Sequence, residues 1–274
     1  MRDLPTRIEG VWPYVCAAMK VAPAPTGGTW WDELIHGGRH VRHVVVEAKK
    51  IAVGLEDRRM AKLLLLAAAI HDLGRLLGDY AYPGFDSDDL VMAVDAARIG
   101  SNRIDHAVLS AGLLQLMPLM DVGPEEMSAV WFAIRWHSIG LVGLHIERAE
   151  TLGQKLLGLL VIADHADAAS PEGAARAKMA LVGKPILSSR FGVDHLRSYL
   201  SRDGLECPVI PVTDMDGYKS ESVAAHWLYN HQATWPMVRA IEHVLPVNYV
   251  NEELLPRMWQ YQVLIETLLS LQAS

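Results

Sequence analysis

Apolar residues recur at helical spacing along most of the chain, and the apolar runs are separated by segments rich in Pro, Gly and Asp. The segments VAPAPTGG and GDYAYPGFDSDD cannot continue a helix, because their Pro and Gly residues interrupt it. The periodic stretches therefore predict an all-α fold, with helices over 7–21, 38–55, 58–73, 88–100, 104–117, 124–137 and 150–169.

The apolar periodicity weakens after residue 170, starting at the segment SPEGAA. Beyond it, GVDHLRSYL, SVAAHWLYNHQ and EELLPRMWQYQVLIETLLSLQ favour helices, whereas CPVIPVTD favours a short strand or an extended loop. We therefore expect a helical-bundle domain over 1–170, with the N-terminal helix included. A less regular, mostly helical extension over 171–274 is expected to pack on that domain.

Composition narrows the classes of protein that the chain can belong to. The chain has 274 residues, of which 51% are hydrophobic, so it can form a substantial core. The longest apolar run, 63–70, is far shorter than the roughly 20 residues that cross a bilayer, and the first residues lack the apolar core of a signal peptide. We therefore expect a cytoplasmic protein with no membrane partner. Two cysteines provide neither a disulfide framework nor a thiolate zinc site, and a net charge of -7 disfavours long nucleic acid as a partner.

Imidazole and carboxylate side chains interrupt the apolar faces of five of the predicted helices. Residues typical of a protein core flank each of these polar side chains. The polar side chains are His40, His71, Asp72, His106, His137 and Asp164. A buried carboxylate needs a compensating partner, and a metal ion would supply one. Imidazole and carboxylate ligands suit divalent ions such as Mn, Fe, Zn or Mg, so the pattern predicts a metal site.

His40 and His43 compete for the first position of this pattern. Val44, Ala48 and Ile51 follow His40 by four, eight and eleven residues, which keeps them on its side of the helix. Counted from His43, the same residues are rotated away. The register therefore favours His40 as the residue that faces the core.

The order H…HD…H…H…D resembles that of the HD-domain superfamily of metal-dependent phosphohydrolases. The similarity covers residues from about 36 to 169 and rests on HxxxVVxxAxxIA at His40, LLLLAAAIHDLGR, HAVLSAGLL and VIADHADA. It implies that His40, His71, Asp72 and Asp164 bind one metal ion, that His106 and His137 bind a second, and that Asp72 bridges the two. The central block has Arg75 where lysine is commonest, and the GYP signature of the cyclic di-GMP phosphodiesterases is missing.

The resemblance implies a helical-bundle HD domain over 1–170 that hydrolyses a phosphoester bond in a nucleotide-like or other small phosphorylated substrate. Two divalent ions (Mn, Fe, Mg, Co, Ni or Zn) would activate a hydroxide, with Asp72 and Arg75 as the catalytic residues. Arg75 and Arg103 are candidates for contacts with the phosphate. His36, in the segment IHGGRH, is expected to face the substrate or to support the ligands, and an ordinary loop histidine is the alternative. The segment 171–274 would cover the site or form a homodimer contact.

Other activities share parts of this pattern. Mixed-valent diiron oxygenases of the same superfamily use the same six ligands, so the ligand pattern alone does not separate them from the hydrolases. Ferrous-dependent consumption of oxygen would favour the oxygenase. A nuclease of a defence system is a further alternative, which the acidic charge disfavours unless a partner chain binds the nucleic acid. A non-catalytic sensor or scaffold would not need all six ligands.

Overall fold

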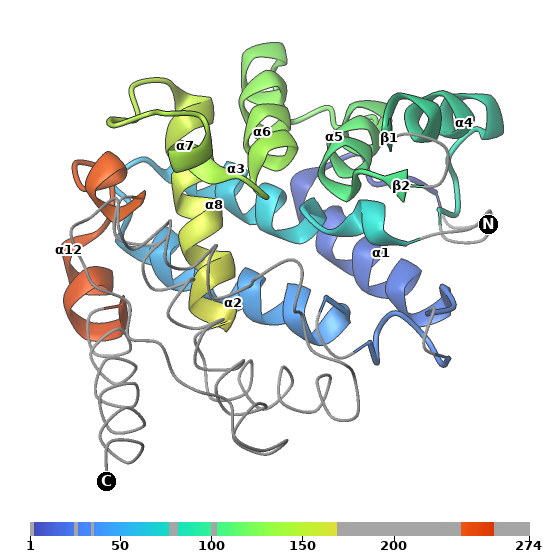
Figure 1. Ribbon diagram of the computed structural model, residues 1–274, viewed down its shortest axis with the longest axis horizontal. Coiled ribbons are helices and arrows are strands. Elements are labelled where there is room, and N and C mark those ends of the chain that lie inside the picture. The colour runs from blue at the N-terminus through green and yellow to red at the C-terminus, as the bar shows by residue number, and fades with distance from the viewer. Residues whose placement is uncertain are drawn as a thin grey trace, which may run out of the picture.

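The computed structural model describes residues 3–24, 27–33, 36–76, 82–99, 103–168 and 237–254, which form a largely helical assembly (Figure 1). The first helices are α1 (Ile8–Val21), α2 (Gly38–Gly54), α3 (Arg58–Ile70) and the 3-10 turn η1 (Leu73–Arg75). They are followed by α4 (Ser87–Ala96), α5 (His106–Leu116), α6 (Pro124–Trp136), α7 (Gly140–Gly143) and α8 (Leu152–Ala168). The last elements are α12 (Val247–Tyr249) and the π-helical turn η3 (Val250–Leu254).

Several helix boundaries differ from those predicted by the sequence pattern. The helix predicted over 104–117 begins only at His106, because Ile104 lies in a strand. α4 ends at Ala96, and the next residues form strand β1 (Arg98–Ile99), which pairs antiparallel with β2 (Arg103–Ile104). The expectation that this helix continues to residue 100 is therefore wrong. α3 ends at Ile70 rather than at 73, because the backbone tightens into η1. Apart from this small hairpin, the described residues are helical or in turns and loops, as the pattern predicts.

Helix α3 lies at the centre of the bundle and packs against α1, α2, α6 and α8. Its residues Leu63, Leu64 and Ala69 are at most 2% exposed although they point in different directions around the helix. This position explains the continuous apolar run LLLLAAA. Asp57 caps the helix by accepting hydrogen bonds from the backbone N–H groups of Arg59 and Met60, at 2.8 and 3.0 Å.

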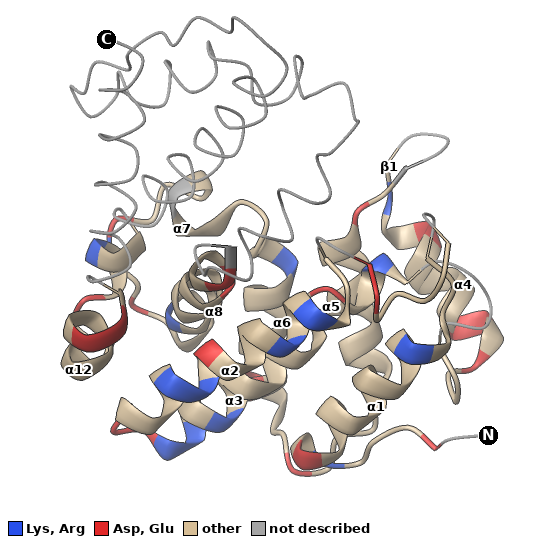
Figure 2. Cartoon of the chain, turned by 90° about the horizontal axis from the view of Figure 1, so that it is seen from below, with Lys and Arg blue, Asp and Glu red and all other residues tan. Residues whose placement is uncertain are grey.

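The described part of the C-terminal segment, 237–254, packs on α8 and α2. A Cβ atom on Gly158 of α8 would lie 2.4 Å from Cγ2 of Ile241, so the glycine permits close contact. Figure 2 shows basic residues on α2 and acidic residues beside the label α12, and Lys50 Nζ lies 2.9 Å from a carboxylate oxygen of Glu253. The remainder of 171–274 lies outside the described residues, so the division of the chain at residue 170 stays a prediction.

No helix in the described part of the chain combines the length and the apolar character needed to span a bilayer. The helices instead bury their apolar faces in one continuous core, to which α1, α2, α3, α5, α6 and α8 all contribute. The six residues predicted to bind metal all lie at or near the ends of these helices. The packing of the bundle therefore determines where these side chains meet.

Candidate metal centre

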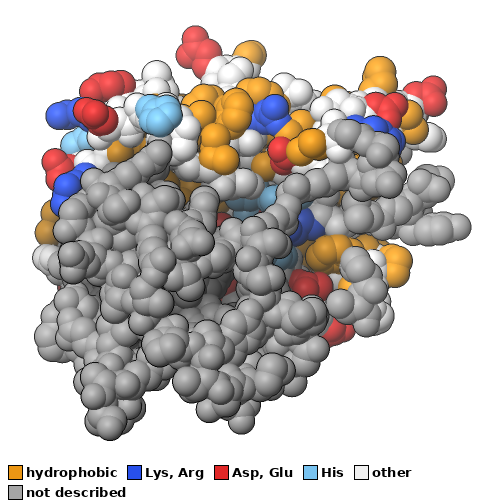
Figure 3. Space-filling view, viewed as in Figure 1, with side chains coloured by type: hydrophobic (Ala, Val, Ile, Leu, Met, Phe, Trp, Pro, Cys, Tyr) orange, Lys and Arg blue, Asp and Glu red, His pale blue; other side chains and the backbone are white. Residues whose placement is uncertain are grey.

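The candidate site lies where the ends of five helices meet around Asp72. His71 follows the last residue of α3, and His137 follows the last residue of α6. His106 is the first residue of α5, His40 lies in the first turn of α2, and Asp164 lies in the last turns of α8. In the view of Figure 3, histidine, basic and acidic side chains are visible together near the centre of the drawn face. The structure thus brings together all six residues that the sequence pattern singled out.

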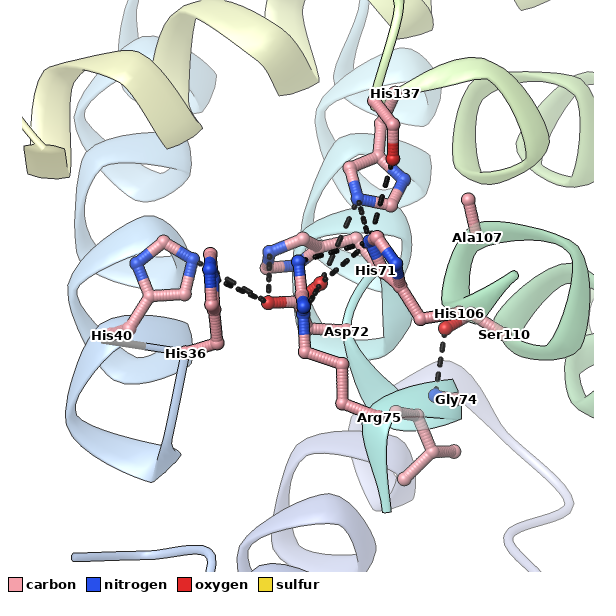
Figure 4. Close-up of polar contacts among 12 residues, drawn as sticks. His36, His40, His71, Asp72, Gly74, Arg75, His106, Ala107, Ser110 and His137 are labelled. Atoms are coloured by element: carbon pink, nitrogen blue, oxygen red, sulfur yellow. Dashed lines mark hydrogen bonds and ion pairs between the residues drawn. The ribbon is translucent and has the colours of Figure 1, made fainter. Parts of the chain in front are cut away.

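The two oxygens of Asp72 face different sets of imidazole nitrogens. Oδ2 lies 3.7 Å from Nε2 of His40 and 3.8 Å from Nε2 of His71. Oδ1 lies 3.4 Å from Nε2 of His106 and 3.7 Å from Nε2 of His137. Figure 4 shows His40 on one side of the carboxylate and His106 and His137 on the other. The carboxylate therefore lies between two groups of donor atoms.

Three groups of donor atoms in the described residues are compact enough to hold a metal ion. Within each group, the donor atoms lie within 4.8 Å of one another. One group consists of His40, His71 and Asp164, another of Asp72, His106 and His137, and the third of His36, His40 and Asp72. In the first of these groups, Nε2 of His40 lies 3.2 Å from Oδ1 of Asp164.

The Nδ1 atoms of three site histidines interact with protein acceptors outside the centre. His71 Nδ1 lies 2.9 Å from the carbonyl oxygen of Ala68, and His137 Nδ1 lies 2.7 Å from that of Ile134. A carbonyl can only accept, so Nδ1 carries the proton in both rings and Nε2 presents its lone pair. Histidines that bind metals are usually held by such a hydrogen bond from the other ring nitrogen.

Asp167 plays the corresponding part for His40. The carboxylate is 1% exposed, and its Oδ2 lies 2.6 Å from Nδ1 of His40. Sequence reasoning did not single out Asp167. The available signal was its spacing, because it follows Asp164 by three residues on one helix and therefore lies on the same face. His43, which the register disfavours as the core-facing residue, has its Nδ1 3.0 Å from the other oxygen of Asp167.

Gly74 allows η1 and the start of α5 to approach closely enough for His106 to reach the centre. A Cβ atom at this position would lie 2.3 Å from the carbonyl oxygen of His106 and 2.7 Å from the backbone nitrogen of Ser110. The Gly74 N–H donates to Oγ of Ser110 at 2.8 Å, which joins the two elements. Asp105 caps α5 through the N–H groups of Ala107 and Val108. The glycine of the HDLGR segment is thus required by packing.

Burial and charge place the ring nitrogens and carboxylates in different protonation states. Burial lowers the pKa of His71 to about 4 and that of His106 to about 3, so both rings are neutral near pH 7. Burial also opposes the ionisation of Asp72, but the charge of Arg75 and the interactions with the surrounding histidines together outweigh it and hold the pKa of the carboxyl well below its usual range. For His40, burial is outweighed by the hydrogen bonds with Asp164 and Asp167, which raise the pKa to about 10.

Several buried polar atoms in this cluster have no hydrogen-bond partner among the described residues. They are Nε2 of His71, both carboxylate oxygens of Asp72, Nδ1 of His36 and Nε of Arg75. Buried polar atoms without partners are rare in folded proteins, and each costs about 1–3 kcal/mol. A divalent cation would satisfy the imidazole nitrogen and the carboxylate oxygens. The residues therefore fit a metal centre.

Arg75 lies beside the same carboxylate oxygen as His106. Its Nε is 2.8 Å from Oδ1 of Asp72, although the N–H group is not directed at that oxygen, and its Nη2 is 3.1 Å from Nε2 of His106. The side chain is 23% exposed, so the guanidinium reaches from the buried carboxylate toward the surface. The backbone of Arg103 lies in β2, and the position of its side chain is outside what the structure describes.

Comparisons with models of known protein families, with curated proteins and with solved structures find no match to this chain. What can be concluded about the site therefore rests on its own residues. These form a helical scaffold with buried groups of histidine and aspartate that can hold divalent metal ions.

Proposed function

We propose that the protein is a metal-dependent phosphohydrolase of the HD-domain superfamily. Its substrate would be a nucleotide-like or other small phosphorylated molecule, and the reaction the hydrolysis of a phosphoester bond. The observation that carries this proposal is the environment of Asp72, because each of its oxygens faces its own group of imidazole nitrogens. A carboxylate in such a position is suited to bridge two ions.

The proposed ligand sets combine the donor groups with the position of Asp72 between them. One ion would be held by His40, His71, Asp72 and Asp164, and the other by Asp72, His106 and His137. When bound, the ions would supply the Lewis acidity that neutralises phosphoryl oxygens and makes water a nucleophile near neutral pH. Imidazole and carboxylate donors admit Mn, Fe, Co, Ni, Zn or Mg at these positions.

The protein's own residues prepare the centre for cations. Both carboxylate oxygens of Asp72, which is 1% exposed, have no hydrogen-bond partner among the described residues, and neither has Nε2 of His71. Because a buried polar atom without a partner is costly, these atoms favour a bound cation. His71 and His106, held neutral by burial, offer lone pairs rather than competing positive charge.

The chemistry and position of Arg75 favour a phosphorylated substrate. A guanidinium binds two oxygens of one phosphate in a planar, paired geometry. Arg75 is partly exposed and lies next to the donor group of His106, so the phosphate that it binds would lie beside the centre. In this role it would hold the phosphoryl group in position and stabilise its negative charge.

The proposal is tested by metal analysis of protein purified without added metal, followed by assays of phosphomonoesters, phosphodiesters and nucleotides with Mn, Fe, Mg, Co and Ni. We expect metal-dependent release of product in the absence of oxygen. Activity and bound metal should be lost in Asp72→Ala and kept in Asp95→Asn, which changes an exposed carboxylate on α4.

Two results would contradict the proposal. Ferrous-dependent consumption of oxygen without phosphoester hydrolysis would assign the centre to the diiron oxygenases instead. Full metal content and turnover in Asp72→Ala would show that Asp72 is not the bridging residue. The far-ultraviolet circular dichroism of each variant shows whether it has kept its helical fold.

A further inference from the structure

The segment IHGGRH brings a further histidine to the centre. His36 lies in the turn that precedes α2, four residues before His40, and its Nδ1 is 3.6 Å from Oδ2 of Asp72. Its ring packs edge-on against the ring of His40, with 5.6 Å between the two centroids. Figure 4 shows both rings on the same side of Asp72. The donor atoms of these three residues form one of the compact groups described above.

The two glycines after His36 make this position possible. A Cβ atom on Gly37 would lie 2.3 Å from the carbonyl oxygen of Glu33, and one on Gly38 would lie 2.2 Å from the ring of Trp31. The backbone N–H of His36 also donates to the carboxylate of Glu33 at 2.6 Å. The turn is therefore tightly packed, and it holds the ring of His36 over Asp72.

The nitrogen that His36 presents is chemically available. Its Nδ1 is buried and has no hydrogen-bond partner among the described residues, although 42% of the side chain is exposed. Burial lowers the pKa of His36, which favours the neutral ring with a free lone pair. His40 and His71 direct Nε2 toward the centre, whereas His36 directs Nδ1.

We propose that His36 is a seventh protein ligand, which joins His40 and Asp72 around the divalent ion on the Oδ2 side of the carboxylate. The proposal rests on the proposed function only in requiring that the centre binds divalent ions. His40 and His71 also face this oxygen, so an ion bound by all three residues would meet three imidazoles. Such a nitrogen-rich position selects Fe, Co, Ni or Zn over Mg, which prefers oxygen ligands.

The test is titration of the metal-free protein with Co²⁺ alone, followed by its visible absorption and by competition with a chelator. We expect His36→Ala to weaken the binding of one Co²⁺ by about tenfold or more, and to alter the absorption band. His36→Asp places a carboxylate oxygen near the position of Nδ1, so it should restore much of the affinity. The matched control is His243→Ala, which removes an exposed histidine.

The outcomes separate this inference from the proposed function. If the wild type binds Co²⁺ but His36→Ala has the same affinity and the same band, His36 is not a ligand. If the metal titrations behave as expected while no phosphoester is hydrolysed, His36 is a ligand and the proposed reaction is wrong. If the wild type binds no Co²⁺, both the ligand role of His36 and the proposed function are wrong. If His36→Ala does not fold, His36→Asp provides the test. A Co²⁺ absorption band identical to that of the wild type would then show that residue 36 does not bind the ion, because exchanging a nitrogen ligand for an oxygen ligand should change the band.

Discussion

The carboxylate of Asp167 lies 2.6 Å from Nδ1 of His40, in the interior of the protein between α8 and α2. This contact orients the ring so that Nε2 faces Asp164 and Asp72. It also favours a proton on Nδ1, because an ionised carboxylate can only accept a hydrogen bond and the ring nitrogen that faces it must therefore donate. Asp167 therefore acts on the metal centre through His40.

Removing this carboxylate should weaken metal binding without removing a ligand. For Asp167→Ala we expect the affinity for the ion at His40 to fall by about 10–100-fold, and Asp167→Asn should lose less because its amide oxygen still accepts a hydrogen bond. Isothermal titration calorimetry with Co²⁺ measures the change. Asp95→Asn serves as the surface control, and equal affinities for Asp167→Ala and the wild type would show that His40 does not depend on this contact.

Replacing His40 and replacing His43 by alanine should have different effects on the metal content of the protein. His40→Ala takes away the imidazole that lies between Asp164 and Asp167, so the ion at that position should be lost. His43 contacts Asp167 and not Asp72 or Asp164, so His43→Ala should keep both ions and change turnover by no more than a few-fold. Metal content per folded chain distinguishes the two variants. Loss of metal in His43→Ala alone would reverse the assignment.

Helix positions could be predicted from the sequence because the bundle depends on apolar periodicity, which a single chain displays directly. The continuous apolar run at 63–70 shows no separate buried and exposed faces, because α3 is surrounded by other helices. Its length and composition still indicate a buried helix. The hairpin at Arg98 and Ile104 was missed. Its strands contain two residues each, which is too short for an alternating pattern to appear.

The candidate site could be predicted where a polar residue interrupts an apolar run, as at His71 and Asp72. Asp167 gave a weaker signal, because its role depends on the packing of α8 against α2, which brings it to a histidine 127 residues away. The position of His36 depends on the fit of two glycines against Glu33 and Trp31. Such steric requirements are not visible in hydrophobic periodicity.

Arg75 should have opposite effects on metal binding and on turnover. Its positive charge lies 2.8 Å from Oδ1 of Asp72, so it repels a cation at that oxygen. Arg75→Met should therefore bind the second ion several-fold more tightly at low salt, while kcat falls by about a hundredfold because the phosphate loses its guanidinium partner. Chelator competition and steady-state kinetics measure the two effects. Arg98→Met is the exposed control, and a parallel fall in affinity and kcat would contradict the phosphate role.

The number of bound ions should depend on the residues around Oδ1. His106→Ala or His137→Ala removes one of the two imidazoles on this side, so bound metal should fall toward one ion per chain and turnover should decrease. His71→Ala should lose more bound metal and more turnover than these two variants, because the His71 nitrogen belongs to the donor group of the first ion. Metal analysis under saturating conditions gives the stoichiometry. A wild type that saturates with one ion would move His106 and His137 to substrate binding.

Glu126 connects the start of α6 to α3. Its carboxylate accepts hydrogen bonds from the side chain of Arg59 and, at 2.8 Å, from the backbone N–H of Gly123. The guanidinium of Arg59 also donates to the carbonyl oxygen of Asp121. These contacts hold the end of α6 opposite to the one that carries His137. They should therefore contribute to stability without touching the metal centre.

The charge of Glu126 should stabilise the fold in a pH-dependent way. The hydrogen bonds with Arg59 lower the pKa of the carboxyl from its ordinary value of 4.5 to about 2. Because the folded-state pKa is the lower one, the stabilisation is fully present above the unfolded-state pKa and is lost as the pH falls through the folded-state value. Both side chains are partly exposed, so Glu126→Gln should lower the free energy of unfolding at pH 7 by only about 0.5–1 kcal/mol.

Urea denaturation of the wild type and of Glu126→Gln at several pH values measures this difference. The gap between the two proteins should be constant above about pH 5 and should shrink toward zero near pH 2, because the wild-type carboxylate then becomes protonated. Glu125→Gln is the matched control, since Glu125 is an exposed neighbour in the same helical turn. A gap that does not change with pH would show that the charge of Glu126 does not account for the stabilisation of α6.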